Sequence, residues 1–315
     1  MIAINFFAKD NRSNTIYIFM AKMRRNHQAQ SKGLQTTFRL VIFLIIAVFA
    51  LVGGYIWFNG TKVVPPDIVA PPPMLRTYLP NSNGDTIHHT YYSLSYLENH
   101  ELAEWVAYLL TKQQLQMPNV DREDYFSPDD KIKTGSAVHA DYSGSGYTRG
   151  HLAPAGDMAF DDIAMKESFF MSNMAPQIKE FNNGVWKELE ENVRDWTYKS
   201  ETLYIIAGPI LQNPIKKIGK QNKVTVPSAF YKVLLDYTGD EKKGIAFVIP
   251  NKLSTERLET YMVSIDSIES LTGLDFFNDM INDGEEEKLE SSMNPALWKV
   301  SDKRYELRIN KWNYE

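Results

Sequence analysis

His151, Asn182 and Glu190 are the residues whose types and spacing could together carry out chemistry. A histidine has an ordinary pKa of about 6.5, so its neutral ring can accept a proton from water at neutral pH. Mg²⁺ prefers oxygen ligands and keeps several waters, so the amide oxygen of Asn182 is a candidate ligand. If Asn182 starts a regular helix, Glu190 lies about 80° past two full turns, where its carboxylate could hold a water of the ion.

Together, a neutral base and a hydrated hard cation are suited to hydrolysing a phosphodiester. That reaction needs an activated water, a cation that neutralises the charged transition state, and stabilisation of the leaving 3′ oxygen. Each residue taken alone also has a structural interpretation: Arg149-Gly150-His151 as a solvated turn, Asn182 as a helix cap and Glu190 as an exposed acid. The chemical interpretation therefore depends on the pattern as a whole.

Three spaced motifs surround these residues. They read Thr148-Arg149-Gly150-His151, Ser172-Asn173-Met174-Ala175-Pro176-Gln177, and FNNGVWKELE over residues 181–190. At these positions the chain resembles the DNA/RNA non-specific endonucleases, which carry a ββα-metal finger. The resemblance covers most of residues 85–280 and includes the runs WVAY, GPI, VPSAFYKV and IESLTGLDFF.

The resemblance implies a role for each matching residue. His151 would be the general base, Asn182 the metal ligand, and Glu190 the residue that holds the water shell of the metal. Arg149 and Asn173 would orient the phosphate and the catalytic groups.

Arg122 and Thr148 complete the comparison with the family. Arg122, in the run REDYF, matches an upstream arginine that contacts the substrate. Thr148 stands where the family usually has Asp, a residue that braces the site, so this departure bears on rate and metal affinity more than on the type of reaction.

The resemblance implies a sequence-non-specific endonuclease that cuts DNA and RNA to 5′-phosphate products with Mg²⁺, or alternatively Mn²⁺. Two other hypotheses stay open: a catalytically weak nucleic-acid-binding module, and a phosphodiesterase for a smaller extracytoplasmic substrate. A homodimer is also kept open.

Charge is unevenly distributed along the chain. Of the 34 Lys and Arg residues, eight lie in residues 1–62, where Asp10 is the single acid among the 39 in the chain, so residues 63–315 carry a formal balance of −12. Nucleic-acid binders are usually basic, which favours the alternatives unless the acids lie away from the groove or bound metal supplies positive charge. Cysteine is absent, which excludes thiolate metal sites and a cysteine nucleophile.

The N-terminal part predicts a membrane anchor. Residues 40–58 run without a charge over about the length that crosses a bilayer. The basic residues 1–39 precede this run and place the N-terminus in the cytoplasm. A Pro-rich linker over 59–75 then leads to an extracytoplasmic, periplasmic or surface-exposed endonuclease domain over 76–315.

The predicted strands and helices that position these residues indicate an α+β fold with a central, mainly antiparallel sheet. Strands are predicted over 86–96, 203–207, 230–236 and 245–249, with a strand or short helix over 102–115. Helices are predicted over 184–198 and 263–272, and the first buries Trp186 and Trp196 in the core. The acidic run at 283–287 is interpreted as a solvated loop.

Overall fold

The computed structural model describes residues 43–48, 78–122, 124–238 and 241–315. The chain divides into two units at residue 70, and the larger one holds every labelled strand and helix. In the smaller unit, residues 43–48 are helical. Within the described residues, no helix has both the length and the apolar character needed to cross a membrane. Most of the predicted segments 1–39, 40–58 and 59–75 lies outside the described residues.

A seven-stranded sheet with antiparallel neighbours forms the centre of the larger unit, as the sequence predicts. Its strand order is β1-β2-β3-β6-β9-β10-β11. The strands are β1 (Asp85–His88), β2 (Tyr92–Leu97), β3 (Leu102–Thr111), β6 (Thr202–Ile210), β9 (Ala229–Asp236), β10 (Lys243–Pro250) and β11 (Met262–Val263). The middle strands are apolar along nearly their whole length because both faces of the sheet are covered.

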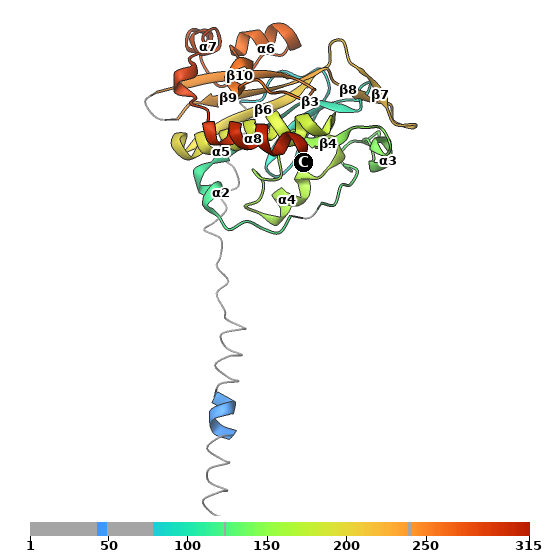
Figure 1. Cartoon of the computed structure of the whole chain (residues 1–315), viewed down its shortest axis with the longest axis vertical. Helices are drawn as coiled ribbons and strands as arrows, with labels where there is room; N and C mark the ends of the chain where they lie inside the picture. The colour runs from blue at the N-terminus through green and yellow to red at the C-terminus, as the bar shows by residue number, and fades with distance from the viewer. Residues whose placement is uncertain (1–42, 49–77, 123, 239–240) are drawn as a thin grey trace, which may run out of the picture. The chain divides into compact units, whose positions relative to one another are not determined.

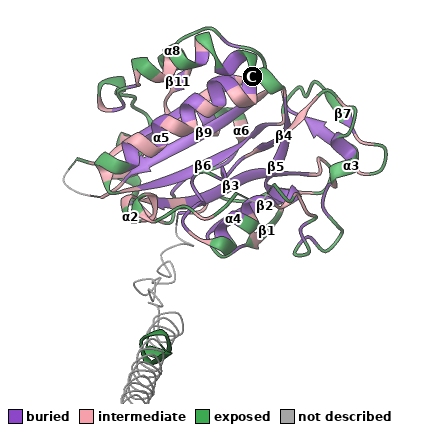
Figure 2. Ribbon diagram, turned by 60° about the horizontal axis from the view of Figure 1, so that its bottom comes forward, coloured by how far each residue is buried: buried purple, intermediate pink, exposed green. Residues whose placement is uncertain are grey.

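Helices cover the two faces of this sheet (Figure 1). One face carries α5 (Lys187–Ser200) and α8 (Asp302–Asn310), and the other carries α6 (Ile265–Thr272) and α7 (Asp283–Glu290). Each face of the sheet therefore has its own apolar core. The core on the α5 side includes Trp186 and Trp196, and the core on the α6 side includes Ile265 and Ile268. Figure 2 shows the buried side of α5 turned toward the sheet. The prediction that both tryptophans pack in the core is confirmed.

A small ββα unit lies beside the main sheet. Strands β4 (Thr148–His151) and β5 (Met174–Gln177) pair antiparallel, with Thr148 opposite Gln177 and His151 opposite Met174. The π-helical turn η3 (Phe181–Trp186) follows and runs into α5. This is the arrangement expected of the predicted ββα-metal finger.

The remaining elements are short. They are α2 (Lys112–Gln116), α3 (His139–Tyr142), α4 (Asp162–Ser168), η2 (Met171–Asn173), β7 (Lys216–Ile218), β8 (Val224–Val226), η4 (Leu258–Tyr261), η5 (Pro295–Leu297) and η6 (Trp312–Tyr314). The predicted strand or helix over 102–115 is β3 followed by the start of α2.

Two predicted elements are wrong in detail. The single strand expected over 86–96 is a hairpin of β1 and β2, because residues 89–91 turn the chain. The acidic run expected as a loop is helix α7, whose first turn is capped by the Asn282 side chain. Acids near a helix N-terminus interact favourably with its dipole, which compensates for the lack of an apolar stripe.

The C-terminal elements α8 and η6 pack against the ββα unit. Arg308 of α8 and Glu188 of α5 form a fully buried ion pair. In η6, Asn313 lies so close to Gly184 that a side chain at that glycine would overlap the Asn313 amide. The segment after α7 thus packs against the turn that carries Asn182.

Candidate active site

Strand β4 places the Arg149-Gly150-His151 motif against β5. A Cβ atom at Gly150 would overlap the buried side chain of Gln177 on the neighbouring strand. Glycine therefore permits the close approach of the two strands at this position. The motif is a strand, and the interpretation as a solvated turn is wrong.

Asn182 lies inside the π-helical turn η3 and does not cap a regular helix as expected. Gly184 breaks the helical geometry there, with φ −95° and ψ −110°. The segment thus consists of two helical pieces that meet at a kink at Gly184. The break also means that the spacing from Asn182 to Glu190 does not follow a regular helix.

Thr148 fixes the direction in which the Asn182 amide faces. The Thr148 hydroxyl lies 3.0 Å from the backbone carbonyl of Gln177, an oxygen that can only accept, so its proton is donated there. The same hydroxyl oxygen therefore accepts the hydrogen bond from Asn182 Nδ2, at 3.1 Å. The amide nitrogen is held toward Thr148, which leaves Oδ1 as the oxygen available to a cation.

His151 is tied to the same turn through its backbone. Trp186, at the end of η3, donates from Nε1 to the His151 carbonyl at 3.3 Å. Both ends of β4 are thus hydrogen-bonded to the turn that holds Asn182. In the described chain no hydrogen bond joins the His151 ring directly to Asn182.

The His151 ring lies in an apolar, cationic environment. It packs edge-on against Phe169, with ring centroids 4.9 Å apart, and its Nε2 is buried without a hydrogen-bond partner. Burial lowers the pKa of His151 to about 3, and the charges of Arg122 and Arg149 act in the same direction. The ring is therefore neutral at physiological pH, as a proton acceptor must be.

Arg149 and Arg122 lie over the two phenylalanines that flank His151. The Arg149 guanidinium is 4.0 Å from the centroid of Phe126, and that of Arg122 is 5.2 Å from the centroid of Phe169. Arg149 also contacts the ring of His139. Arg122 pairs with Asp124 in an exposed position, where the pair contributes little to stability. Both guanidiniums therefore lie beside the rings that flank His151.

Asn173 is fully buried, and both polar atoms of its side chain are hydrogen-bonded to the backbone. Its Nδ2 donates to the carbonyls of Ala153 and Ser168 at 2.9 and 2.7 Å, and its Oδ1 accepts from the Ala153 amide at 2.9 Å. The expectation that Asn173 orients the phosphate and the catalytic groups stays a prediction. The hydrogen bonds of its side chain fix the loop that leaves His151.

Glu190 lies within a cluster of charged groups that sequence reasoning did not identify. Burial raises the pKa of Glu190 to about 7, while Lys232 and Arg194 oppose that rise. Lys232, on β9, is fully buried and its Nζ has no hydrogen-bond partner. Arg194 is anchored by Asp157 at 2.6 Å. At neutral pH the Glu190 carboxyl is therefore divided between its charged and its protonated form.

These residues fit a divalent cation. The single amide oxygen of Asn182 is oriented by Thr148, and the Glu190 carboxyl lies on α5, the helix that follows the break at Gly184. An oxygen ligand with a second, orienting hydrogen bond is typical of metal sites in proteins.

Comparisons with known proteins agree with this geometry. A sequence model described as DNA/RNA non-specific endonuclease matches residues 71–282. The chain is 34% identical over 217 residues to the mitochondrial Nuclease EXOG of Danio rerio, covering 64% of this chain and 63% of that protein. It is 38% identical over 204 residues to a Nuclease of Nostoc sp., covering 60% of this chain and 72% of that protein.

A solved structure has a similar fold. The crystal structure of an EndoG/EndoGI complex superimposes with a TM-score of 0.61 at 32% identity, covering 66% of this chain and 91% of that chain. The chain spans less than two thirds of the mitochondrial relative from Danio rerio. Helices α7 and α8 begin beyond residue 282, where the family match ends.

Proposed function

Because this chain belongs to the DNA/RNA non-specific endonuclease family, we propose that it hydrolyses phosphodiester bonds of DNA and RNA without sequence specificity, in a metal-dependent reaction that leaves 5′-phosphate ends. The observation that carries the proposal is the Thr148 to Asn182 hydrogen bond, which orients a ligand oxygen in the ββα unit that also holds His151.

His151 acts as the general base in this proposal. Its neutral ring accepts a proton from the attacking water as the oxygen of that water forms a bond to phosphorus. The bond from phosphorus to the 3′ oxygen breaks, and the leaving oxygen takes up a proton from solvent water. Arg149 and Arg122 pair with the non-bridging oxygens, which positions the backbone without reading bases.

Asn182 would hold the cation, with Glu190 acting on its water shell. When bound, Mg²⁺ or Mn²⁺ supplies positive charge that stabilises the transition state and the leaving oxygen. Asn173 acts as a positioning residue, since its side chain fixes the loop after β4.

The decisive experiment compares cleavage of plasmid DNA and of RNA by the purified full-length chain, with and without MgCl₂ and after EDTA. We expect cleavage only with divalent metal, and its loss in His151→Ala. The control is His100→Ala, because His100 hydrogen-bonds to Thr225 and belongs to neither strand nor helix of the ββα unit. Full activity of His151→Ala would refute the assignment of the base.

The acidic balance of residues 63–315 favours a second candidate, a phosphodiesterase for a smaller substrate or a binding module with weak catalysis. Turnover of a chromogenic phosphodiester, compared with long DNA, separates these functions. Salt-sensitive retention of DNA without cleavage would identify the binding module.

We also propose that residues 40–58 anchor the enzyme in a membrane with the nuclease domain outside the cytoplasm. The uncharged run and the basic residues before it support this orientation. Protease added to spheroplasts, in which both the cell surface and the periplasmic side of the inner membrane are accessible, should remove the nuclease domain. Protection that is lost only on lysis of the spheroplasts would contradict the proposal.

A further inference from the structure

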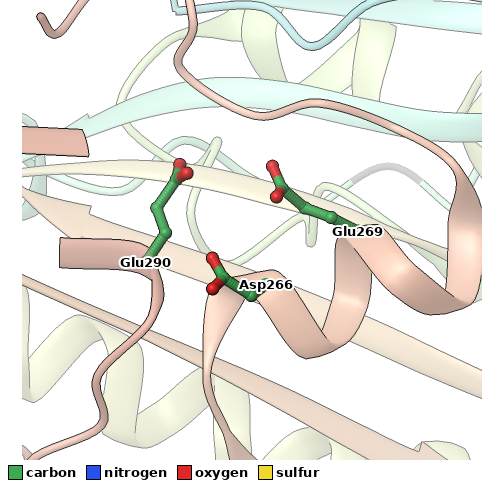
Figure 3. A group of neighbouring side chains, drawn as sticks. All are labelled: Asp266, Glu269 and Glu290. Atoms are coloured by element: carbon green, nitrogen blue, oxygen red, sulfur yellow. The ribbon is translucent and has the colours of Figure 1, made fainter. Parts of the chain in front are cut away.

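Three carboxylates meet between α6 and α7, on the sheet face opposite α5 (Figures 1 and 3). Asp266 and Glu269 are three residues apart on α6 and therefore share one face of that helix. Glu290 is the last residue of α7. One oxygen of each residue lies within 4.8 Å of the other two. Figure 3 shows the three carboxylates turned toward a common space.

Glu290 supplies an independent sign that a ligand belongs in this space. Its side chain is only 4% exposed, and its Oε1 has no hydrogen-bond partner. A buried carboxylate oxygen without a partner is costly, and such groups in folded proteins are normally satisfied by a donor or an ion. The unpartnered oxygen is on the carboxylate aimed at Asp266 and Glu269.

Within the described residues, no basic side chain forms an ion pair with these three carboxylates. None of the ion pairs there includes Asp266, Glu269 or Glu290, and Lys242 of the same region pairs with Glu285. Glu269 has one donor, the Phe276 backbone amide at 2.9 Å. The site therefore concentrates negative charge without compensation from a side chain.

We propose that Asp266, Glu269 and Glu290 bind one Ca²⁺ ion that joins α7 to α6. Ca²⁺ takes six to eight oxygens at about 2.3 to 2.6 Å, so oxygens on opposite sides of the ion are about 4.6 to 5.2 Å apart. The spacing of the three carboxylates lets all of them reach one such ion directly. Three carboxylates, some of them bidentate, with water, complete an ordinary Ca²⁺ shell.

This site is separate from the catalytic centre in place and in origin. The central sheet lies between it and α5, which follows Asn182. Glu290 lies beyond residue 282, so the match to the family does not include the complete ligand set. The bound ion would fasten the added helix α7 to the part of the fold that the family shares.

The test is calorimetric titration of CaCl₂ into the full-length Asn182→Ala protein, in which the catalytic ligand is removed. We expect one Ca²⁺ per chain and a Tm that rises with CaCl₂. Glu290→Gln in that background should weaken Ca²⁺ binding by about tenfold or more and abolish the rise in Tm. Glu287→Gln makes the same charge change at an exposed position of α7 and should leave both unchanged.

Asp266→Asn provides a second variant at a half-buried position if Glu290→Gln does not fold. Absence of stoichiometric Ca²⁺ binding at millimolar concentration would overturn the proposal. Binding that is unchanged in Glu290→Gln or Asp266→Asn would also overturn it. MgCl₂ in place of CaCl₂ should give weaker binding, because Mg²⁺ demands a tighter octahedral shell.

Discussion

The hydroxyl of Thr148 lies 3.1 Å from the side-chain nitrogen of Asn182 and receives its hydrogen bond. Since the same hydroxyl donates to the Gln177 carbonyl, the amide of Asn182 has one allowed orientation. Thr148 departs from the family pattern, but it orients Asn182 by accepting a hydrogen bond. Any side chain with an acceptor atom at this position could do the same.

Replacing Thr148 by Val should remove that orientation while keeping the shape of the side chain. We expect metal affinity to fall by about 10- to 100-fold, the range found when a partner of a metal ligand is lost. The apparent Mg²⁺ dependence of DNA cleavage measures this change. Thr148→Ser keeps the hydroxyl and should retain affinity close to that of the parent, so an equal loss in both variants would contradict the orienting role.

The pH profile of cleavage should reflect Glu190 and not His151. The pKa of Glu190 is raised to about 7, so its carboxylate gains a proton and loses its charge as the pH falls below that value. The pKa of His151 is lowered to about 3, so the base stays neutral over the same range. We expect activity to fall from pH 8 to pH 6, about one unit on each side of the Glu190 value. Added Mg²⁺ should shift the midpoint downward because the cation and the proton compete.

Lys232→Met should move this acid limb upward in pH. The charge of Lys232 lowers the pKa of Glu190, so removing that charge favours the protonated carboxyl at neutral pH. The midpoint of cleavage against pH is the measurement. Lys303→Met, at an exposed position of α8, is the matched control and should keep the parent midpoint. A profile unchanged in Lys232→Met would rule out this electrostatic coupling.

Arg308→Ala should destabilise the protein strongly. It leaves Glu188 buried and without its cation, a change that costs about 3 to 5 kcal/mol in comparable pairs. Urea unfolding followed by tryptophan fluorescence gives the free energy of unfolding. Arg257→Ala breaks an exposed pair with Asp302 and should cost little stability, because exposed ion pairs contribute little. Similar losses in the two variants would argue against the buried pair as an anchor of α8.

The sequence predicts the sheet well where local signals are strong. Strands β6, β9 and β10 are apolar and β-branched, with breakers or turns near their ends, and they appear where expected with a few added residues. The hairpin of β1 and β2 was missed because the turn at residues 89–91 contains no Gly, Pro, Asn or Asp. Helix α7 was missed because it lacks an apolar stripe and depends on its cap and on contacts with the fold.

The site shows the same division between local pattern and tertiary contact. His151 and Asn182 could be found from motifs because the ββα unit is a short, continuous stretch of chain. Lys232 could not be connected to Glu190, since it comes from β9 and its charge matters only once it is buried. The hydrogen bonds between the Asn173 side chain and the backbone likewise depend on how two loops pack.

The packing of Asn313 against Gly184 also bears on when the enzyme becomes competent. A ribosome releases Gly184 long before Asn313, and contacts between distant parts of a chain form late in folding. The turn that carries Asn182 therefore lacks its packing contact with Asn313 until the C-terminal segment has been synthesised and has folded against it. We therefore expect chains that end before Asn313 to be poor nucleases.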